Sequence, residues 1–409
     1  MTIWLIEPRD PLIVRDGRPF EPTPGAQAIS LPFPHPSTTT GGARTRAGLD
    51  NNGHFAYQAH SKELEELKRL KVRGPLLVQL AENGSHAIQV QWFAPAPLDA
   101  VILPSQQKDD DADTLTLRRL VPLQRLAGAQ TDFNPGELAL VGLVQAEKSK
   151  PASEAPRFWK WEIFQSWLLD PSQKEGKITN LSELGYNDLQ KDRRLHVSID
   201  AEKLVAREGA LFATSGLEFT YPGRNEKRLS EAQRLALAID VEQHNRFKIK
   251  AGLAGLGGER RMVCWHESSE KFPSLPPEIE DKIVIDKACR VVVLTPAFFR
   301  AGYYPNWLLE EHYGVRPRPA AIAIQRPTVV SGWDLENRRP KQSRRLAPAG
   351  SVFFLKLEGS DDAIRDWVKH MWMQCISDDE QSRLDGFGLA VVGTWSGKTV
   401  EMQERGKES

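Results

Sequence analysis

Alternating apolar positions predict several β-strands in the first two thirds of the chain. Residues 2–7 alternate between two faces and Pro8 ends the pattern, which is typical of an opening strand. Alternation over 235–241 also favours a strand, although Ser230 and Gln233 match the capping box of a helix. Two further strands are predicted, at 76–80 and 88–93.

Three helices are predicted in the same part of the chain. Ser61 is a suitable cap for a helix over 62–70, where leucines repeat at helical spacing. A short helix is expected over 39–49, although two glycines interrupt it. Three large apolar residues at helical spacing predict a core helix over 158–169.

The C-terminal third contains the clearest helix. After Ser360, apolar residues recur three and four positions apart from Ile364 to Cys375, and two aspartates occupy the first turn. Short apolar runs around this helix predict three strands, at 291–294, 351–357 and 389–395. A helix laid across an antiparallel sheet, an α+β arrangement, is therefore expected here.

The length and composition favour two globular domains. A chain of 409 residues is long for a single core, and two domains can each bury their own. Residues 267–281 are rich in proline and charge, so they are the predicted linker between a domain at 1–270 and a domain at 285–409. With 40% hydrophobic and 26% charged residues, the composition excludes disordered and fibrous proteins.

The charge balance limits how the chain can contact nucleic acid. Its 54 basic and 54 acidic residues give a formal net charge of zero. Proteins that coat nucleic acid through bulk charge are usually clearly basic, so that class is excluded. Any contact with nucleic acid must therefore be local.

The cysteines and apolar runs indicate where the chain is expected to work. Cys264, Cys289 and Cys375 are far apart and odd in number, which supports neither a disulfide framework nor a zinc site. The longest apolar run, 138–144, is too short to span a bilayer, and no signal peptide is indicated. We expect a cytoplasmic protein with no metal, no cofactor and no membrane partner.

The segment 15–20, RDGRPF, is the first candidate RNA contact. Arg15 and Arg18 stand on either side of an Asp-Gly turn, and arginine forks suit phosphate oxygens. The alternative, which the local sequence alone favours, is a common turn with an internal Arg–Asp pair.

The segment 252–261 is the second candidate. Its four glycines lack the Cβ atoms that keep a backbone away from RNA, and successive N–H groups can bind an anion beside Arg260 and Arg261. A flexible hairpin is an equal alternative. A dinucleotide site is disfavoured, because Arg260 stands where the third glycine of that fingerprint belongs.

Two charged runs differ in what they predict. Residues 337–345 carry five cations, including Arg338 and Arg339, and no acid. A solvated loop is the default interpretation of such a run, but a local attraction for phosphate slightly favours contact with RNA or a partner. The acidic run at 108–113 is predicted to be a solvated loop.

Three further patterns are weak indicators of catalysis or RNA binding. The segment 385–392 lacks the basic and aromatic residues of an RNA-stacking signature and predicts a buried strand kinked by glycines. The segment 393–399 has three residues between its glycines where a P-loop needs four, so ATP hydrolysis is not supported. His196 stands in an alternating strand, which favours a hydrogen-bonded structural histidine over an acid–base catalyst.

Taken in order, these segments resemble a known family, the RAMP-superfamily subunit three of the Cmr module in type III-B CRISPR effector complexes. The resemblance covers nearly the whole chain, and although each motif is weak alone, their order is specific. The motifs lie at 15–20, 36–44, 196–200, 209–219, 257–261, 331–334, 347–352 and 386–395.

The resemblance implies an α+β fold of two ferredoxin-like (RRM-like) RAMP domains with glycine-rich loops and inserted loops. It implies a non-catalytic, RNA-binding subunit in antiviral defence that holds the 5′ repeat-derived tag of the guide RNA (crRNA). Its other implied partners are the large signalling subunit, the adjacent backbone RAMP subunit that it bridges to, and target RNA near the tag. The alternative is a metal-independent endoribonuclease that processes guide RNA through His196.

The RNA-binding residues expected from the motifs and the resemblance are arginines, glycines and hydroxyl residues. We expect five of the arginines to line one tag-binding surface, with the glycine loop at 255–258 against the RNA backbone. These five are Arg15, Arg18, Arg44, Arg260 and Arg261. The remaining candidates are Ser37, Thr38, Gly255, Gly257, Gly258, Arg338 and Arg339. No catalytic and no metal-ligating residue is expected.

Overall fold

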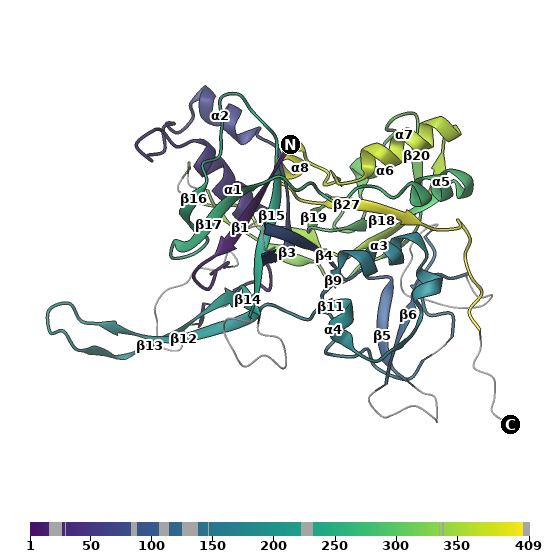
Figure 1. Cartoon of the computed structure of the whole chain (residues 1–409), viewed down its shortest axis with the longest axis horizontal. Coiled ribbons are helices and arrows are strands. Elements are labelled where there is room, and N and C mark those ends of the chain that lie inside the picture. The colour runs from purple at the N-terminus through teal and green to yellow at the C-terminus, as the bar shows by residue number, and fades with distance from the viewer. Residues whose placement is uncertain are drawn as a thin grey trace.

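The computed structural model describes residues 1–15, 27–28, 30–82, 88–105, 114–124, 138–145, 147–221, 232–334, 336–337 and 339–403. Within these residues the chain has a mixed α and β fold in which strands dominate. Two large antiparallel sheets form two halves that lie side by side along the longest axis (Figure 1). The expected mixture of helices and strands is therefore confirmed.

The first sheet is built around β1 (Thr2–Pro8), which pairs antiparallel with β15 (Gln233–Val241) and β17 (Arg261–Ser268). The strand order is β11-β9-β4-β3-β15-β1-β17-β16, with β14 beside β15. The four strands predicted here from alternation are confirmed, and Ser230 of the rejected helix cap lies outside the described residues. The other members are β3 (Val72–Glu82), β4 (Ile88–Pro95), β9 (Phe158–Lys160), β11 (Gly185–Tyr186), β14 (Thr220–Tyr221) and β16 (Gly252–Leu256).

Helices α1 (Pro36–Ala47) and α2 (Lys62–Lys68) pack on one face of the first sheet. Both predicted helices are confirmed, and Ser61 caps α2 by accepting a hydrogen bond from the Leu64 amide at 3.2 Å. Gly42, which weakens the helical pattern, has a packing role. A Cβ atom there would lie 2.7 Å from Leu256 Cδ1, so glycine allows α1 to approach β16.

The second sheet has the order β20-β25-β18-β27-β26 and is antiparallel throughout its described pairs. Helix α7 (Asp361–Met371) buries Ile364 and Trp367 against it, next to α5 (Pro277–Asp286). The predicted helix across an antiparallel sheet is thus confirmed. The strands are β18 (Ala288–Val293), β20 (Arg316–Ala323), β25 (Val352–Glu358), β26 (Gln374–Cys375) and β27 (Leu389–Thr394).

The helix predicted as far as Cys375 ends earlier, at Met371. Met373 adopts a left-handed backbone with φ of 57°, and the chain turns so that Cys375 joins the sheet in β26. The apolar spacing runs past the end of the helix because β26 is also buried in the core. Periodicity therefore located the helix correctly but not its C-terminus.

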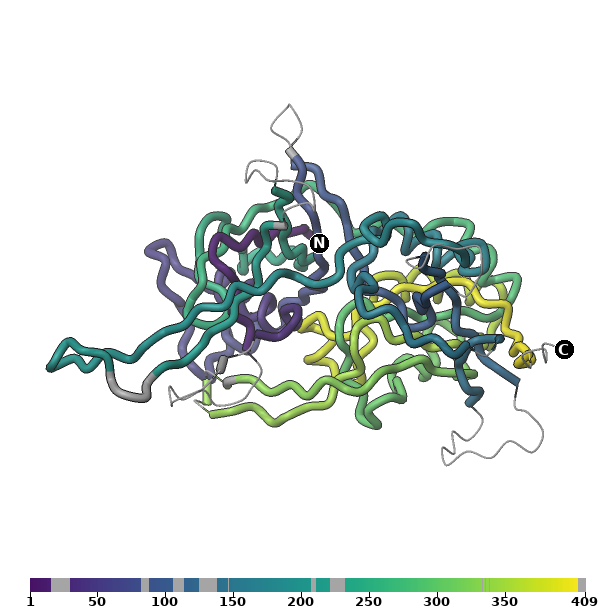
Figure 2. Tube along the Cα trace, turned by 90° about the horizontal axis from the view of Figure 1, so that it is seen from below, coloured from purple at the N-terminus to yellow at the C-terminus, as the bar shows by residue number. Residues whose placement is uncertain are grey.

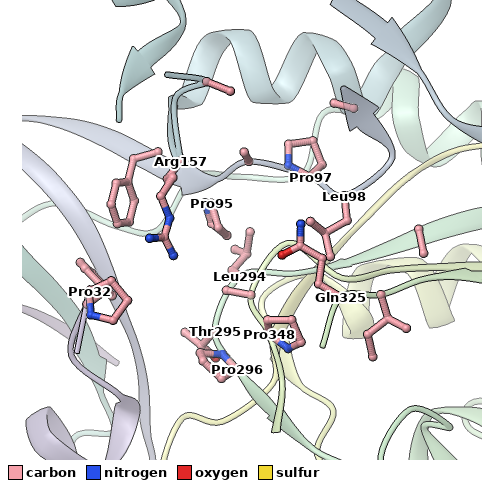
Figure 3. Close-up of a pocket in the computed structure, with 18 of the residues that line it drawn as sticks. Pro32, Pro95, Pro97, Leu98, Arg157, Leu294, Thr295, Pro296, Gln325 and Pro348 are labelled. Atoms are coloured by element: carbon pink, nitrogen blue, oxygen red, sulfur yellow. The ribbon is translucent and has the colours of Figure 1, made fainter. Parts of the chain in front are cut away.

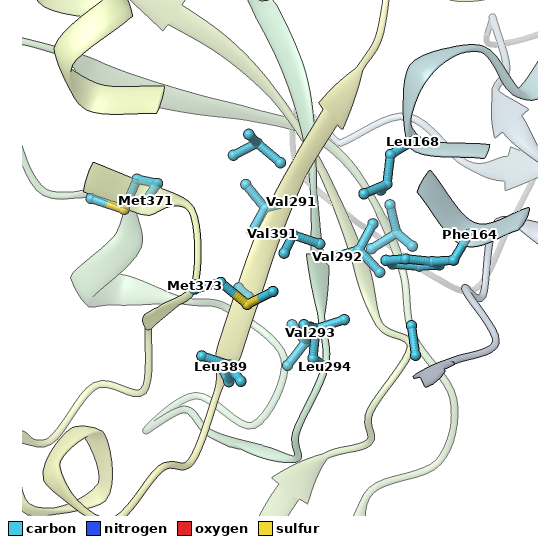
Figure 4. Packing of buried hydrophobic residues seen from close by; sticks show 14 of the residues in the cluster. Phe164, Leu168, Val291, Val292, Val293, Leu294, Met371, Met373, Leu389 and Val391 are labelled. Carbon is cyan, nitrogen blue, oxygen red and sulfur yellow. The ribbon is translucent and has the colours of Figure 1, made fainter. Parts of the chain in front are cut away.

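The helix predicted over 158–169 is wrong in its first turn. Residues 158–160 form β9, which pairs with β4, and helix α3 (Trp161–Leu169) begins after it. Phe158 and Trp159 are buried on opposite faces of this short strand, so their apolar character does not distinguish it from a helix. Figure 4 shows Phe164 of α3 on one side of β18 and β27, with Met371 on the other.

A buried ion pair fixes α3 to the second sheet. Asp99, in the connection after β4, pairs with Arg290 of β18, and both side chains are only 2% exposed. Trp167 Nε1 donates to Asp99 at 2.9 Å, while Arg290 donates to the carbonyls of Trp167 and Leu168 at 2.8 and 3.2 Å. Arg290 thereby satisfies carbonyl groups at the end of α3 that have no partner inside the helix.

The segment predicted as a linker is shorter than expected. Strand β17 continues to Ser268 and α5 begins at Pro277, so part of 267–281 is regular structure. Phe272, between them, packs edge-on against Trp92 with ring centroids 5.4 Å apart. One hydrophobic cluster contains residues of both sheets, and the division into domains at 1–270 and 285–409 stays a prediction.

Two extensions leave the sheets. Strands β12 (Gln190–Ile199) and β13 (Ala206–Glu218) form a long hairpin, the β12–β13 ribbon, which projects from the body in both views (Figures 1 and 2). The segment from β21 (Thr328–Val330) to β24 (Arg344–Ala347) extends from the second half toward the first (Figure 2).

The remaining elements are short. The strands are β2 (Gln27–Ala28), β5 (Ala100–Pro104), β6 (Leu115–Arg119), β7 (Val121–Pro122), β8 (Val141–Gly142), β10 (Gly176–Ile178), β19 (Ala297–Phe298), β22 (Trp333–Asp334) and β23 (Arg339–Pro340). The helices are α4 (Leu181–Leu184), α6 (Asn306–Leu309), α8 (Glu380–Leu384) and a 3₁₀ turn at Pro171–Lys174. The acidic run at 108–113 lies outside the described residues. None of the helices in the described ranges has the length and apolar character that crossing a membrane requires.

Replacing Asp99 with alanine is expected to destabilise the fold by about 3–5 kcal/mol, because it leaves the Arg290 charge buried without its partner. The control is Glu358→Ala, which breaks an exposed ion pair with Arg318, whose side chains are 56% and 51% exposed. That change should cost less than about 1 kcal/mol. Urea unfolding followed by tryptophan fluorescence measures both, and equal shifts would contradict a special role for the buried pair.

Candidate nucleic-acid interface

The glycine-rich segment forms a tight hairpin between β16 and β17. Gly257, Glu259 and Arg260 all have left-handed backbones, with φ of 71°, 55° and 49°. Two of these residues are not glycine, so surrounding contacts must hold the turn in this conformation. The segment is thus a hairpin, as one of the two interpretations expected, and its contact with RNA stays a prediction.

The hairpin tip is bound to the chain that follows β1. The Gly258 amide donates to the Ile13 carbonyl at 2.7 Å, and a Cβ atom at Gly257 would lie 2.5 Å from the same oxygen. The glycines therefore allow close approach of the protein's own backbone. The prediction that successive amides face an anion is wrong for Gly258, whose amide is already bonded.

Three distant segments meet at this point. Residues Leu12 and Ile13 bridge to Leu217, at the base of the β12–β13 ribbon, and to Gly258. Arg15 follows on the exposed surface, where its backbone bridges to Ser30. The structure thus brings the segment of Arg15 next to the glycine hairpin, while Arg18 lies outside the described residues. A common RNA-binding surface of these arginines stays a prediction.

The two arginines of the hairpin have different surroundings. Arg260 is exposed and lies over Gly255. A Cβ atom added to Gly255 would lie 3.1 Å from the Cβ of Arg260. Arg261 Nη2 is held by Glu259 at 2.7 Å, and its side chain is largely buried. Arg260 is therefore the residue whose guanidinium is better placed to meet an approaching phosphate.

Arg44 occupies a different place from the hairpin arginines. Its Nη1 donates to Asp385 at 2.6 Å, and its Nη2 donates to the Leu70 carbonyl at 2.9 Å. These contacts turn Arg44 toward the second half, so the structure does not bring it onto the surface of Arg260. Ser37 is exposed in the first turn of α1, and Thr38 is half-buried beside it.

The basic run of the second half lies on the extension between β21 and β24. Arg339 is exposed in a short ribbon, and Arg344 lies 4.8 Å above the ring of Phe298. Glu336 in the same extension pairs with Lys68 of α2, which joins the two halves. Arg338 lies outside the described residues.

His196 lies on the β12–β13 ribbon. Its Nε2 shares a hydrogen bond with Thr214 Oγ1 at 2.9 Å, and its ring stacks on Phe212 with centroids 5.2 Å apart. The predicted hydrogen-bonded strand histidine is thus observed. Among the described residues, these two contacts of His196 are with a threonine and a phenylalanine, and neither side chain is a second acid or base.

A cleft of about 800 Å³ is lined by residues of both halves. Figure 3 shows Pro95 and Arg157 from the first half above Pro296 and Pro348 from the second. His35, which precedes Ser37 and Thr38, also lines the cleft, and its Nε2 is buried without a partner among the described residues. Burial lowers the pKa of His35 to about 4.

The sequence did not predict the exposure of the β12–β13 ribbon. Leu195 and Leu204 are 72% and 80% exposed, and Val197, Ile199 and Leu211 are exposed as well. The available signal was a run of aliphatic residues alternating with polar ones. That pattern predicts a strand with one apolar face. It does not reveal that this face is exposed to solvent and not packed on the core.

Comparison with known proteins identifies the family. The family model described as CRISPR-associated protein (Cas_Cmr3) matches residues 4–395, nearly the whole chain, and the chain belongs to this family. The resemblance drawn from the ordered motifs is therefore confirmed. A search of curated protein sequences gives no match.

Two kinds of solved structure are similar to the chain. A chain in the cryo-EM structure of the Type III-B Cmr-beta bound to cognate target RNA is 16% identical, with 86% of each chain covered and a TM-score of 0.45. A chain in the crystal structure of the Csm3-Csm4 subcomplex of the type III-A CRISPR-Cas interference complex is 10% identical. It has a TM-score of 0.32, with 88% of this chain and 94% of that chain covered.

The buried His35 predicts a pH dependence of stability. Its folded pKa of about 4 lies below the ordinary 6.5, so the unfolded chain takes up a proton that the folded chain does not. The stabilisation is fully present above pH 6.5 and is lost as the pH falls toward 4, by about 3 kcal/mol.

The measurement is urea unfolding at pH 7 and pH 4 for the wild type and His35→Gln, which cannot titrate in this range. Between pH 7 and pH 4 the free energy of unfolding should fall by about 3 kcal/mol less in His35→Gln than in the wild type. An identical loss in both proteins would show that His35 does not remain neutral in the folded chain.

Proposed function

We propose that the chain is a non-catalytic RNA-binding subunit of a type III-B CRISPR ribonucleoprotein in antiviral defence. It holds the 5′ repeat-derived tag of the guide RNA. It also bridges the large signalling subunit to the adjacent backbone RAMP subunit, close to target RNA. Family membership supports the assignment to the CRISPR system, and the basic hairpin surface supports the role in RNA binding.

The observation that carries the RNA-binding role is the contact between Ile13 and Gly258. It places Arg15 and Arg260 each two residues from the same backbone hydrogen bond, on segments more than 240 residues apart in sequence. Because the net charge of the chain is zero, RNA must be attracted by such local groups of cations. Guanidinium forks on a rigid hairpin suit the phosphates of a single-stranded end.

Each half is proposed to be a ferredoxin-like RAMP unit with inserted loops. Both contain an antiparallel sheet with helices on one face, α1 and α2 in the first half and α5 and α7 in the second. Under this proposal the segment containing α3 is an insertion of the first unit that packs on the sheet of the second.

The β12–β13 ribbon supports a role inside a larger assembly. Contiguous exposed aliphatic side chains are unusual on a protein that works alone and are typical of surfaces that a partner covers. A cytoplasmic ribonucleoprotein supplies such partners in its neighbouring subunits and its RNA. The proposal therefore assigns the ribbon to contacts formed on assembly.

The alternative, an endoribonuclease acting through His196, has weaker support. Thr214 and Phe212 hold the imidazole, and neither can serve as its catalytic partner at neutral pH. We propose that the chain has no catalytic activity and needs no metal or cofactor.

Replacing Arg260 with alanine should weaken binding of the guide RNA by the assembled complex by roughly tenfold. The reason is that a charge-assisted hydrogen bond to phosphate contributes about 1.5–3 kcal/mol. Arg318→Ala is the matched control, because it removes an exposed arginine from β20 in the second half.

Ultraviolet crosslinking locates the contact in the same samples. Guide RNA labelled within its 5′ tag should crosslink to peptides around Arg15 and 255–261 in the wild type, and the yield should fall in Arg260→Ala. Crosslinks confined to other subunits would contradict the proposal and leave this chain as a protein scaffold.

The enzymatic alternative is tested by incubating the purified chain with repeat RNA in EDTA. No specific cleavage is expected, and His196→Ala should give the same RNA pattern as the wild type. Specific cleavage that disappears in His196→Ala, but persists in Thr214→Val, would replace the proposed function by the nuclease.

A further inference from the structure

The first sheet has an uncovered region next to the glycine hairpin. Gly255 of β16 pairs with Met262 of β17, and the Met262 carbonyl accepts a hydrogen bond from the Arg9 amide at 2.9 Å. Gly255, Met262 and Arg9 therefore form one row across the strands, and Arg260 lies over Gly255 at its start. Arg9 and Met262 are exposed, as is Leu253 in the next row.

A buried glutamate organises the charges at the end of this row. Glu7 of β1 is 5% exposed and accepts two hydrogen bonds from Arg234 of β15, at 2.8 and 3.0 Å. Arg9 Nη2 lies 3.2 Å from the same carboxylate, and His266 Nε2 lies 3.6 Å from it. Glu7 is thus shared by two arginines and approached by a histidine.

This arrangement has more positive charge than the glutamate needs. The bidentate contact from Arg234 already neutralises Glu7 and satisfies both of its oxygens. Arg9 is a second guanidinium on the same carboxylate, with half of its side chain exposed to solvent. Along the row from Arg260 to Arg9 the described charged groups are four arginines (Arg9, Arg234, Arg260 and Arg261) and three carboxylates (Glu7, Glu259 and Asp10, whose Oδ2 accepts a hydrogen bond from the Met262 amide at 2.9 Å). The surplus of one positive charge attracts an anion.

We propose that Arg9, oriented by Glu7 and Arg234, binds a phosphate of single-stranded RNA whose path continues from Arg260 across the exposed residues of β16 and β17 to the chain that follows β1. This inference rests on the proposed RNA-binding function and extends its surface to residues outside the glycine and arginine motifs. Leu253 and Met262 lie beside the path, where apolar side chains can contact bases.

RNA fits this surface better than a protein partner does. Arg260 and Arg9 lie at opposite ends of one cross-strand row, with Met262 between them. A polyanion that meets the first arginine is therefore led to the second. The apolar area between them is small and interrupted by charge, which is unlike the apolar centre of a stable protein interface.

The test is Arg9→Ala in the reconstituted complex, titrated with labelled guide RNA at several salt concentrations. Loss of one phosphate contact on a single strand should lower the slope of log affinity against log salt by about 0.7. Affinity should fall roughly threefold to tenfold at moderate salt. Arg9→Lys should retain most of the slope, because it retains the charge.

The controls separate binding from folding. Glu7 keeps its bidentate partner in Arg9→Ala, so the melting temperature should match the wild type within a few degrees. Arg318→Ala, an exposed arginine on the second sheet, should leave the slope unchanged.

The outcomes distinguish this inference from the proposed function. A wild-type slope and affinity in Arg9→Ala, together with weakened binding in Arg260→Ala, would overturn the phosphate contact at Arg9 and leave the tag-binding role intact. Wild-type binding in both variants would overturn both. A lower slope in both, without a loss of stability, supports both.

Discussion

The buried pair of Asp99 and Arg290 is the interaction on which the arrangement of the two halves depends. Arg290 lies in the central strand β18, whereas Asp99 belongs to the connection that leaves the first sheet after β4. Arg290 also donates to the last carbonyls of α3, so one guanidinium holds a connection, a helix and a sheet together. The contact thereby fixes the end of α3 against the second sheet, and Leu98 and Ala100 on either side of Asp99 line the cleft.

Elements with a strong local pattern could be predicted from the sequence. The stripe of α7 reports burial of one helix face, so a single period identifies it. Strands β1 and β15 are buried on both faces, and their short apolar runs have the length and residue types of core strands. Their ends were predicted less well. Helix α7 and strand β9 border other buried segments, and apolar spacing alone does not show where one element stops and the next begins.

The candidate site could be predicted only in part, because its geometry comes from pairing between distant segments. The sequence marked Arg15 and Arg260, and the structure brings their segments together through Ile13 and Gly258. It could not show that Arg44 pairs with Asp385, more than 300 residues away. Nor could it single out Arg9, whose surroundings are created by strand register rather than by neighbouring residues.

The β12–β13 ribbon has a consequence for how the chain must be produced. In the described sheet β12 is an edge strand, and its unpaired backbone stands beside exposed leucine and isoleucine side chains. Such an edge is a template for pairing with another copy. Under the proposal that partners cover the ribbon on assembly, a chain made in excess of them is prone to aggregate, and balanced synthesis protects its solubility.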